Sequence, residues 1–303
     1  LENREIMMRM FPDLFHSNRV TPIDDYPTRL LQTLMSLAPQ KCENPEPVVV
    51  LFTPGPLNSA YYEHSFLSDQ MGIEMVESSD LYVDGQFLYM KTVDGPKKVD
   101  VVYRRIDDDF LDPLCFNPQS VIGVAGIMDV YRTGGVNICS APGAGIADDK
   151  AIYIYVPKMI EFYLGEKPIL DNVETWNCEK EDQLKYVLDN ISDLVIKEVD
   201  GSGGYGMLIG PKSSKSEIEE FKNKLSTNSS GYIAQPLLDL SFTPTLVKNQ
   251  VEGRRVDLRP FCLLGETAQL SSGGLTRVAM NEGSFVVNSS QGGGVKDTWV
   301  LAE

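Results

Sequence analysis

Residues 194–209, LVIKEVDGSGGYGMLI, form the most informative segment of the chain. Four glycines, at positions 201, 203, 204 and 206, stand between two runs of apolar residues that favour strands. Glycine-rich loops let backbone N–H groups approach phosphate oxygens closely, because no Cβ stands in the way. A P-loop or a dinucleotide-binding loop would be followed by a helix. Since strand formers lie on both sides, the segment predicts a glycine-rich hairpin, a flexible lid over a nucleotide.

Lys197 is the cation of the first predicted strand. Because side chains alternate between the two faces of a strand, Lys197 shares a face with Val195 and Val199. A cation on that face can meet the α- or β-phosphate of a nucleotide beneath the hairpin. A plain hairpin with a solvated lysine fits the same pattern, and the segment alone does not decide between the two.

Two further segments are candidates for nucleotide contacts. Asp149-Lys150 stands at the start of a predicted helix, where most lysines are simply solvated. Residues 232–238, YIAQPLL, predict a short strand that ends at Pro236. Such a strand end can offer backbone groups to an adenine edge, with Gln235 as a side-chain partner. A buried strand end without a ligand is the alternative.

Residues 254–261, RRVDLRPF, place three charged side chains on one face of a predicted strand. Two-residue alternation puts Arg255, Asp257 and Arg259 on that face. An aspartate between two arginines can hold Mg²⁺ while the arginines neutralise phosphate charge. The alternative is a surface row of ion pairs, which contributes little to stability.

The first half of the chain reads as a parallel α/β unit, because strand, loop, helix and strand follow one another. Arg104, Arg105 and residues 107–109 follow a predicted strand, at the sheet edge where ligands of open α/β sheets bind. A solvated run of charges is the alternative. The predicted strands are 48–52, 73–76, 99–103 and 136–140, with a helix at 59–71 and a hairpin of 81–83 with 87–91.

The glycine- and proline-rich residues 141–145, APGAG, predict a domain boundary. We expect a helical leader at 1–45, an α/β substrate-binding domain at 46–145, and a nucleotide-binding domain at 146–303. The last domain is predicted to contain helices at 148–164, 183–191 and 216–225, and strands at 254–264, 275–279 and 284–288.

Composition restricts the class of protein. The 303 residues include 27 Lys and Arg against 43 Asp and Glu, a formal net charge of −16, which disfavours a nucleic-acid partner. No apolar run approaches the ~20 residues of a membrane span. The five cysteines are scattered without a C-x-x-C pair, and there are two histidines, which disfavours a disulfide framework or a zinc site. We therefore expect a cytoplasmic protein that binds neither nucleic acid nor membrane.

The order of these features resembles the ATP-grasp superfamily of carboxylate–amine ligases. More narrowly, the chain is similar to the circularly permuted type 2 group, whose relatives include glutathionylspermidine synthetase-like proteins. The resemblance covers essentially the whole chain. Beyond Asp149-Lys150, Lys197 with its hairpin, Gln235 and Arg255-x-Asp257, it rests on NRVTPIDDY at 18–26, TPGP at 53–56, YRRIDDDF at 103–110, DLRPF at 257–261, GLTRVA at 274–279 and VNSSQGGG at 287–294.

The resemblance implies an α/β (α+β) ATP-grasp fold, circularly permuted, with an open α/β substrate domain. It implies that ATP, with Mg²⁺, phosphorylates a small-molecule or peptide carboxylate, and that an amine or another nucleophile displaces phosphate from the acyl phosphate. By position it assigns Lys150 and Lys197 to nucleotide phosphates, Gly203, Gly204 and Gly206 to the lid, Gln235 and Leu237 to the adenine site, Asp257 and Asn288 to magnesium, and Arg255 and Arg277 to the transferring phosphoryl group.

The sequence departs from the superfamily pattern at the metal site. Members usually place a carboxylate and an asparagine two residues apart on one strand, whereas Val286-Val287-Asn288 has the asparagine alone. The chain also begins at Leu1 in a way that resembles an internal segment. We therefore expect a fragment whose metal site is completed by an upstream segment. The alternative function is a nucleotide-binding module without turnover, or a subunit of a larger peptide-modifying system.

Overall fold

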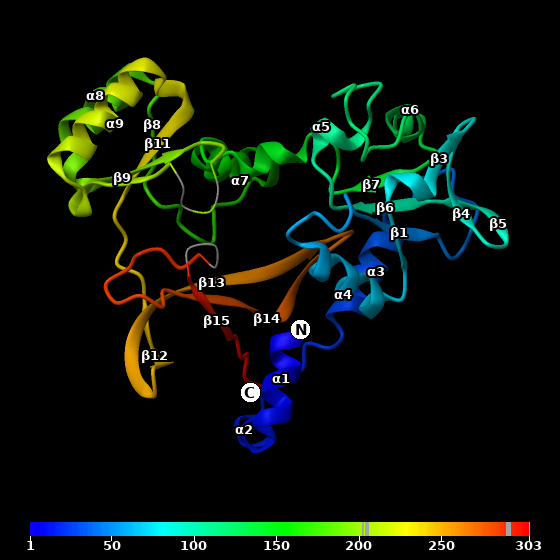
Figure 1. The fold of residues 1–303 in the computed structure, drawn as a ribbon, viewed down its shortest axis with the longest axis horizontal. Helices are drawn as coiled ribbons and strands as arrows, with labels where there is room; N and C mark the ends of the chain where they lie inside the picture. Colours follow the sequence, from blue (N-terminus) through cyan, green and yellow to red (C-terminus); the bar gives the residue numbers. More distant parts are fainter. Residues whose placement is uncertain (202, 204–205, 289–291, 303) are drawn as a thin grey trace. The chain divides into compact units, whose positions relative to one another are not determined.

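The computed structural model describes residues 1–201, 203, 206–288 and 292–302. The chain divides into two compact units, which Figure 1 shows together. Unit 1 contains Leu1–Ala144, Pro260–Gly274 and Asp297–Glu303, and unit 2 contains Gly145–Arg259 and Leu275–Lys296. Each unit therefore combines segments that are far apart in the sequence.

A four-stranded parallel sheet forms the core of unit 1 (Figure 1). Its strand order is β2-β1-β6-β7. All four residues of β1 are buried, as expected of a parallel strand that is covered on both faces. The predicted apolar strand at 48–52 is thereby confirmed. The strands are β1 (Val49–Phe52), β2 (Glu74–Val76), β6 (Val101–Arg104) and β7 (Asn137–Cys139).

Helices cover both faces of this sheet. Leu30 and Leu34 of α3 (Tyr26–Ser36) pack with Leu51 on one face, and Ile127 of α6 (Ile127–Arg132) belongs to the cluster on the other. The helix α4 (Tyr61–Met71) connects β1 to β2 and ends at Gly72, whose φ of 67° an L-residue rarely adopts. A short helix, α5 (Asp108–Leu111), follows β6. The predicted helix at 59–71 and strand at 73–76 are confirmed.

Unit 1 also contains a three-stranded antiparallel sheet, whose strands lie between β2 and β6 in the sequence. It contains β3 (Leu81–Asp84), β4 (Phe87–Thr92) and β5 (Gly95–Val99), and the predicted hairpin is confirmed with Gly85 at a φ of 57° in its turn. The strand predicted at 99–103 is confirmed as β6 from Val101 onward, but Val99 belongs to β5. The buried carboxylate of Asp100 accepts a hydrogen bond from the Val48 amide at 3.0 Å, and this residue separates β5 from β6.

The N-terminal helices α1 (Glu2–Met10) and α2 (Pro12–Asn18) are tied to the C-terminal segment of unit 1. The buried Arg4 guanidinium donates to Asp297 Oδ2 at 2.5 Å and to the carbonyl oxygen of Thr298 at 2.7 Å. Trp299 donates its indole N–H to the same Asp297 oxygen at 2.7 Å and contacts the Phe15 ring. The first and last segments therefore stabilise each other.

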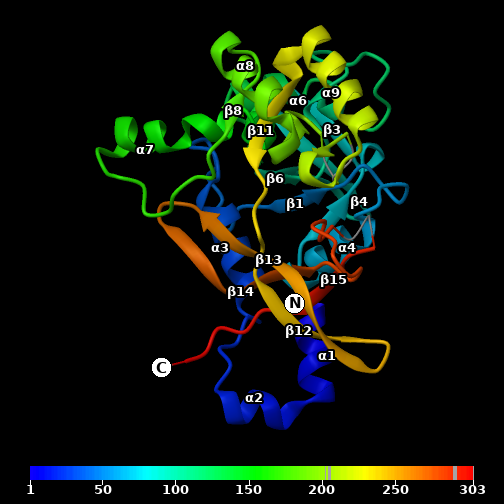
Figure 2. The ribbon, with the colours of Figure 1, turned by 90° about the vertical axis from the view of Figure 1, so that its left-hand side faces the viewer.

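An antiparallel sheet with strand order β10-β9-β11-β8 forms the core of unit 2. Two helices pack on it, α8 (Glu181–Asn190) and α9 (Lys215–Thr227), as both views show (Figures 1 and 2). A capping box of Ser214 with Glu217 begins α9. The predicted hairpin is confirmed, because Ile196 pairs with Leu208 across it. The strands are β8 (Trp176–Asn177), β9 (Leu194–Glu198), β10 (Leu208–Ile209) and β11 (Tyr232–Pro236).

The helix predicted at 148–164 is shorter than expected. Two 3₁₀ turns, Ala144–Asp148 and Ile152–Tyr155, precede an α-helix, α7 (Val156–Leu164). Pro157 lacks the amide hydrogen that a helix interior needs, and so it lies in the first turn of α7. This proline fixes where the α-helix begins, which the pattern of apolar residues alone does not indicate.

A third sheet has the strand order β12-β13-β14-β15. The strands predicted at 254–264 and 275–279 are parts of longer ones, whereas 284–288 forms no strand. There the Ser284 hydroxyl bonds with both the amide and the carbonyl of Val286, which favours a turn over a strand. The strands are β12 (Phe242–Val247), β13 (Gln250–Leu264), β14 (Ala268–Val278) and β15 (Gly294–Asp297). Over the described residues, no helix has the length and hydropathy to cross a bilayer.

Candidate functional site

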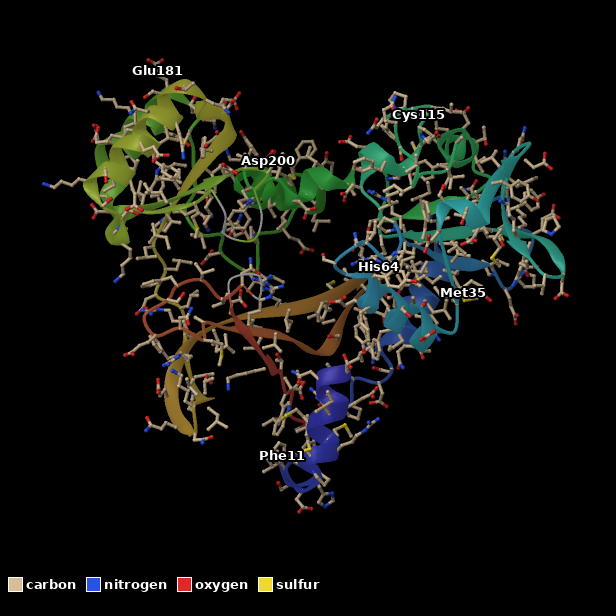
Figure 3. The ribbon with its side chains drawn as sticks, viewed as in Figure 1. Phe11, Met35, His64, Cys115, Glu181 and Asp200 are labelled. Atoms are coloured by element: carbon tan, nitrogen blue, oxygen red, sulfur yellow. The ribbon has the colours of Figure 1, made fainter. Side chains whose placement is uncertain are left out.

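A cleft of about 330 Å³ lies at the glycine-rich hairpin of unit 2. Its volume is at the lower end of the range for small-molecule sites, about 300–1,000 Å³. Figure 3 labels Asp200, which lies in the loop of this hairpin, two residues after the end of β9. The side chains that carry charge or hydrogen-bonding groups in the lining are Lys150, Lys197, Glu198, Arg259 and Asn288.

Lys150 reaches the cleft because its backbone is bonded to the end of the hairpin strand. Its amide donates to the carbonyl oxygen of Val199 at 3.0 Å. Its Nζ donates to the carbonyl oxygens of Val199, at 3.5 Å, and of Gly201. This side chain therefore holds the base of the glycine-rich loop.

Lys197 lines the same cleft from β9. Its Nζ donates to Gln235 Oε1 at 2.7 Å, and Gln235 Nε2 donates to Thr175 Oγ1 at 2.9 Å. Burial, and then the positive charge of Lys150, lower the pKa of the Lys197 ammonium. Two cations that line one cleft are unfavourable on their own and favour an anionic ligand there.

The loop glycines allow the hairpin to lie close to Glu198. At Gly206 the φ is 65°, and an added Cβ would stand 2.6 Å from the Glu198 carboxyl carbon. An added Cβ at Gly201 would stand 3.0 Å from the Glu198 Cβ. Gly203 lines the cleft. Gly204, which the resemblance assigns to the lid, lies outside the described residues.

A second wall of the cleft connects three of the predicted catalytic and metal residues. Arg259 donates to Asp257 Oδ2 at 2.9 and 3.1 Å, and Asp257 Oδ1 accepts from the Arg277 amide at 3.3 Å. The Arg277 guanidinium donates in turn to Asn288 Oδ1. Arg259 and Asn288 line the cleft, so this network meets the ligand space at both of its ends.

Arg255 lies behind an aromatic side chain of the wall. Its guanidinium stands 3.9 Å from the ring centroid of Phe285, which lines the cleft, and 4.7 Å from that of Phe242. It also pairs with Asp239 at 2.9 Å. This side chain is 14% exposed, so Arg255 supports the Phe285 wall in this arrangement.

The two residues assigned to the adenine site lie elsewhere than in the lining of this cleft. Among the described residues, Gln235 meets it through Lys197, and Leu237 is half-buried just beyond β11. Sequence reasoning missed Thr175, Glu198, Met207 and Phe285. The alternation of β13 did contain the signal for Arg259, which follows Asp257 by two residues.

The donor set suits magnesium in its chemistry. Magnesium prefers oxygen ligands and is usually held by one or two carboxylates together with substrate phosphates. Asp257 and Asn288 offer a carboxylate and an amide oxygen, and both contact Arg277. Over the described residues there is no group of three or more His, Cys, Asp and Glu side chains that could hold a metal by itself.

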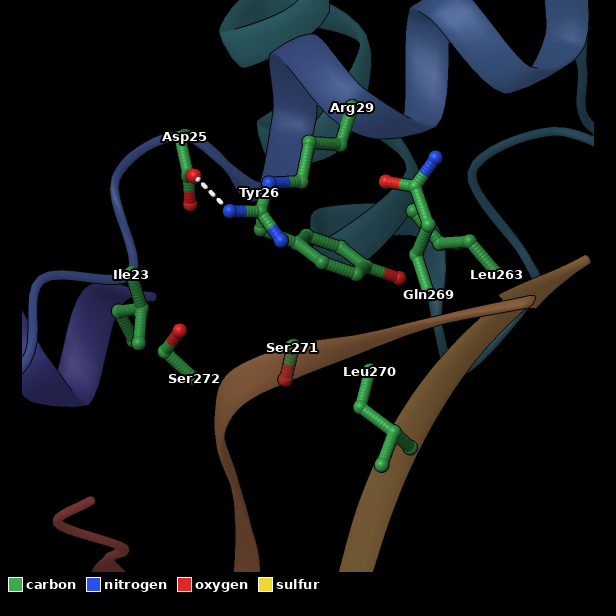
Figure 4. Close-up of a pocket in the computed structure, with 9 residues that line it drawn as sticks. All are labelled: Ile23, Asp25, Tyr26, Arg29, Leu263, Gln269, Leu270, Ser271 and Ser272. Carbon is green, nitrogen blue, oxygen red and sulfur yellow. Dashed lines mark ion pairs between the residues drawn. The ribbon is translucent and has the colours of Figure 1, made fainter. Parts of the chain in front are cut away.

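Unit 1 contains a second, much smaller pocket, shown in Figure 4. Tyr26, Gln269 and Ser271 are among the residues that line it, and Asp25 pairs with Arg29 at 2.6 Å beside it. Its volume of about 10 Å³ holds no more than one water molecule. In this arrangement the pocket has no room for a small-molecule ligand.

The two arginines at the end of β6 differ in their surroundings. Arg104 pairs with Asp108 at 2.8 Å and donates to the carbonyl oxygens of Ser140 and Ile106, so it holds the local loops. Arg105 is exposed and donates to the Tyr103 hydroxyl at 3.3 Å. Of the two, Arg105 is the guanidinium that a ligand in solution can reach.

Comparison with known protein families agrees with this arrangement of two lysines, a glycine-rich hairpin and the strand that carries Asp257. The model of the family described as circularly permuted ATP-grasp type 2 matches residues 1–279. The chain belongs to this family. The resemblance drawn from the sequence and the α/β ATP-grasp fold class are thereby confirmed.

Three relatives illustrate what the chain is similar to. An uncharacterized protein of Synechocystis sp. is 55% identical over 302 residues, which are 99% of this chain and 62% of the relative. An uncharacterized protein of Mycobacterium tuberculosis is 51% identical over 303 residues, 100% of this chain and 55% of the relative. A Frankia casuarinae protein named "Putative glutamate--cysteine ligase 2-2" is 38% identical over 302 residues, 99% of this chain and 35% of the relative. The chain thus spans between about a third and three-fifths of these relatives.

Proposed function

We propose that the chain belongs to an ATP- and Mg²⁺-dependent carboxylate–amine ligase that forms an amide or peptide-like bond, and that it contains both the nucleotide-binding domain and the substrate-binding domain. A carboxylate oxygen of the substrate attacks the γ-phosphorus of ATP, and the bond to the β-phosphate oxygen breaks, releasing ADP. The amine then attacks the acyl carbon, phosphate leaves with the bonding electron pair, and the amine loses its proton. The family and the ligase name of the Frankia relative support this proposal.

The observation that carries the proposal is the pair of lysines at the hairpin cleft. Lys150 and Lys197 line it together, under backbone that glycines leave accessible. Bound triphosphate oxygens would accept from both ammonium groups and from the loop amides, and so would offset the repulsion between the two cations. Catalysis in such phosphoryl transfers is mostly positioning and neutralisation of charge.

The second wall would serve the transfer itself. Asp257 and Asn288 would hold magnesium, which supplies positive charge to the phosphate oxygens when bound. Arg277, and Arg255 through the Phe285 wall, would favour the negative charge that develops on the phosphoryl group. Gly203 and Gly206 would lie over the nucleotide, with Leu237 near the base.

The acceptor would bind to the 46–145 region, where Arg105 is exposed at the carboxyl edge of the parallel sheet. A guanidinium there suits a substrate carboxylate, from a small molecule or a peptide. We place this reaction in the cytoplasm, where ATP is abundant, and infer that the remaining length of the relatives contributes to substrate choice or to the metal site.

The test is the stabilisation of the protein by nucleotide. A ligand at ~100 times its Kd adds about 2.7 kcal/mol to the free energy of unfolding. We expect ADP or ATP with magnesium to raise the Tm of the wild-type chain, and Lys197→Ala to remove that rise because the phosphate loses its cation. Lys222→Ala, on α9 and paired there with Glu219, should keep it. An undiminished rise in Lys197→Ala would refute the phosphate role.

A nucleotide-binding module without turnover is the second candidate. The observation that favours it is the Asp257 carboxylate, which bonds to Arg259 where a magnesium ligand needs a free oxygen. ADP release from ATP in the presence of carboxylates and amines separates the two candidates. Release by a full-length relative but not by residues 1–303 would favour the module.

A further inference from the structure

The side-chain amide of Gln235 is held from both ends. The Thr175 hydroxyl donates its hydrogen to the carbonyl oxygen of Val173 at 2.8 Å, so towards Gln235 it can only accept. Gln235 Nε2 therefore faces Thr175, at 2.9 Å, and its carbonyl oxygen faces Lys197 Nζ, at 2.7 Å. The Thr175 hydroxyl thus determines which end of the amide meets the lysine.

The sheet brings these residues together from neighbouring strands. Lys197 lies on β9. Gln235 lies on the adjacent strand β11 and pairs with Val195 of β9. Thr175 directly precedes β8, which borders β11 on its other side. Directly opposed residues of antiparallel strands project to the same face. Gln235 is therefore on the face of Lys197, one step farther from the cleft, which Lys197 lines and Gln235 does not.

We propose that Gln235, oriented by Thr175, is a positioning residue that holds the Lys197 ammonium at the cleft for a nucleotide phosphate. It is not the residue that recognises the base. This inference rests on the proposed function and assigns to Gln235 a role different from the adenine contact that the family resemblance implies. Among the described residues, no ion pair engages Lys197, so a neutral amide leaves its full charge available to phosphate.

The chemistry explains why an amide suits this position. A carboxylate would hold the ammonium more strongly, but it would neutralise it before the ligand arrives. An apolar side chain would leave a half-buried ammonium without its acceptor and favour the neutral amine. The glutamine oxygen stabilises the ammonium in one place and leaves the net charge of the pair at +1.

The first experiment measures Lys197 in the protein without ligand. The rate of acetylation of its amine by acetic anhydride is followed against pH by peptide mass spectrometry. We expect the profile to move to lower pH in Gln235→Leu and in Thr175→Val, and to higher pH in Gln235→Glu. Gln250→Leu, an exposed glutamine at the start of β13, should leave it unchanged. Identical profiles in wild type and all three variants would overturn the proposal.

The second experiment separates a phosphate role from a base role. Affinities for ADP, GDP and adenosine are measured by calorimetry in wild type, Gln235→Leu and Gln250→Leu. Loss of a hydrogen bond to a charged group predicts about tenfold weaker ADP binding in Gln235→Leu. The ratio of ADP to GDP affinity and the adenosine affinity should stay at their wild-type values. A collapse of that ratio, or weaker adenosine binding, would assign Gln235 to the base instead.

The two failures are distinguishable. If the wild-type chain binds none of the three ligands, the proposed function fails, while the acetylation profiles still decide whether Gln235 holds Lys197. If Gln235→Leu does not fold, as judged by circular dichroism, Gln235→Glu tests the same proposal. We expect its acetylation profile to move to higher pH and its ADP affinity to fall, because the carboxylate neutralises the ammonium.

Discussion

Two lysines that line one cleft raise each other's free energy until an anion binds. The effect is visible in Lys197, whose pKa is lowered by burial and by the charge of Lys150. A phosphate group brought to Nζ favours the ammonium form and must raise that pKa. Nucleotide binding is therefore coupled to protonation at this single side chain.

This coupling predicts how nucleotide affinity depends on pH. Because the pKa of Lys197 is lower in the free protein than in the complex, binding takes up protons in the window between the two values. Affinity for ADP should fall as pH rises through the free-state pKa of Lys197. Calorimetry in buffers of different ionisation enthalpy measures the uptake; a heat of binding that is the same in all buffers across this window would contradict it.

Asp257 carries a prediction about magnesium. In Asp257→Asn the carboxylate charge is lost, so the extra rise in Tm that magnesium adds to ADP should disappear, while the rise from ADP alone remains. The measurement is thermal unfolding with ADP, with and without magnesium. Asp182→Asn, on the exposed start of α8, is the control. A magnesium effect that survives in Asp257→Asn would remove this residue from the metal site.

At the residue scale, the sequence indicates functional side chains unevenly. Lys197 stands beside a glycine-rich loop, and Asp257 lies between two arginines, so pattern and chemistry point to both. Thr175 gives no signal, because its role depends on β8 lying next to β11, where Asn177 pairs with Ile233, 56 residues farther along the chain. Long-range strand pairing decides which side chain orients which.

The hairpin of β9 and β10 is the element on which the site depends. Gly206 is in the left-handed region and close to Glu198, so an alanine there is disfavoured by backbone conformation and by crowding. A left-handed L-residue is disfavoured by about 1–2 kcal/mol. Gly165, at the end of α7, has a φ of 69° with open space around it.

This difference gives a matched pair of variants. We expect Gly165→Ala to lower the free energy of unfolding by about 1 kcal/mol, from its backbone alone. Gly206→Ala should lower it further and weaken nucleotide binding, because the loop must move off Glu198. Urea unfolding and ADP affinity are the measurements. If removing the carboxylate in Gly206→Ala/Glu198→Ala restores nothing beyond the single variant, crowding at Glu198 is not the cause.

Element boundaries were predictable where local chemistry sets them. Gly72 ends α4 and Gly85 turns the β3–β4 hairpin, and both are visible in the sequence. The strand expected at 99–103 begins only at Val101, because Asp100 bonds to a backbone amide 52 residues away and separates it from β5. The strand expected at 284–288 failed because a serine side chain competes for the backbone. Neither partner is apparent from hydrophobic pattern.

At the scale of the whole chain, Arg4 ties the beginning of unit 1 to its final segment. Its side chain is 4% exposed and that of Asp297 is 7% exposed. Removal of one member of a buried ion pair leaves the other charge uncompensated, which destabilises by about 3–5 kcal/mol. The helices α1 and α2 have few other buried anchors, since Arg4 is the buried residue of α1.

We therefore expect Arg4→Met to lower the stability of unit 1 by about 3 kcal/mol or more. Trp299 fluorescence during urea unfolding reports on this unit, in a Trp176→Phe background that silences unit 2. Arg9→Met removes an arginine that is 79% exposed and should change stability by less than about 0.5 kcal/mol. Equal effects of the two variants would show that the Arg4–Asp297 pair stabilises little.

The interleaving of segments in the two units has a practical consequence for dissection of the protein. A cut at residue 145 would remove 260–274 and 297–302 from the piece that begins at Leu1, and with them Asp297 and Thr298, two of the partners of Arg4. The other piece would carry these segments as unpaired polypeptide. Each half expressed alone should therefore be incompletely folded or aggregate, whereas co-expression of both halves would allow the strands of the two pieces to pair.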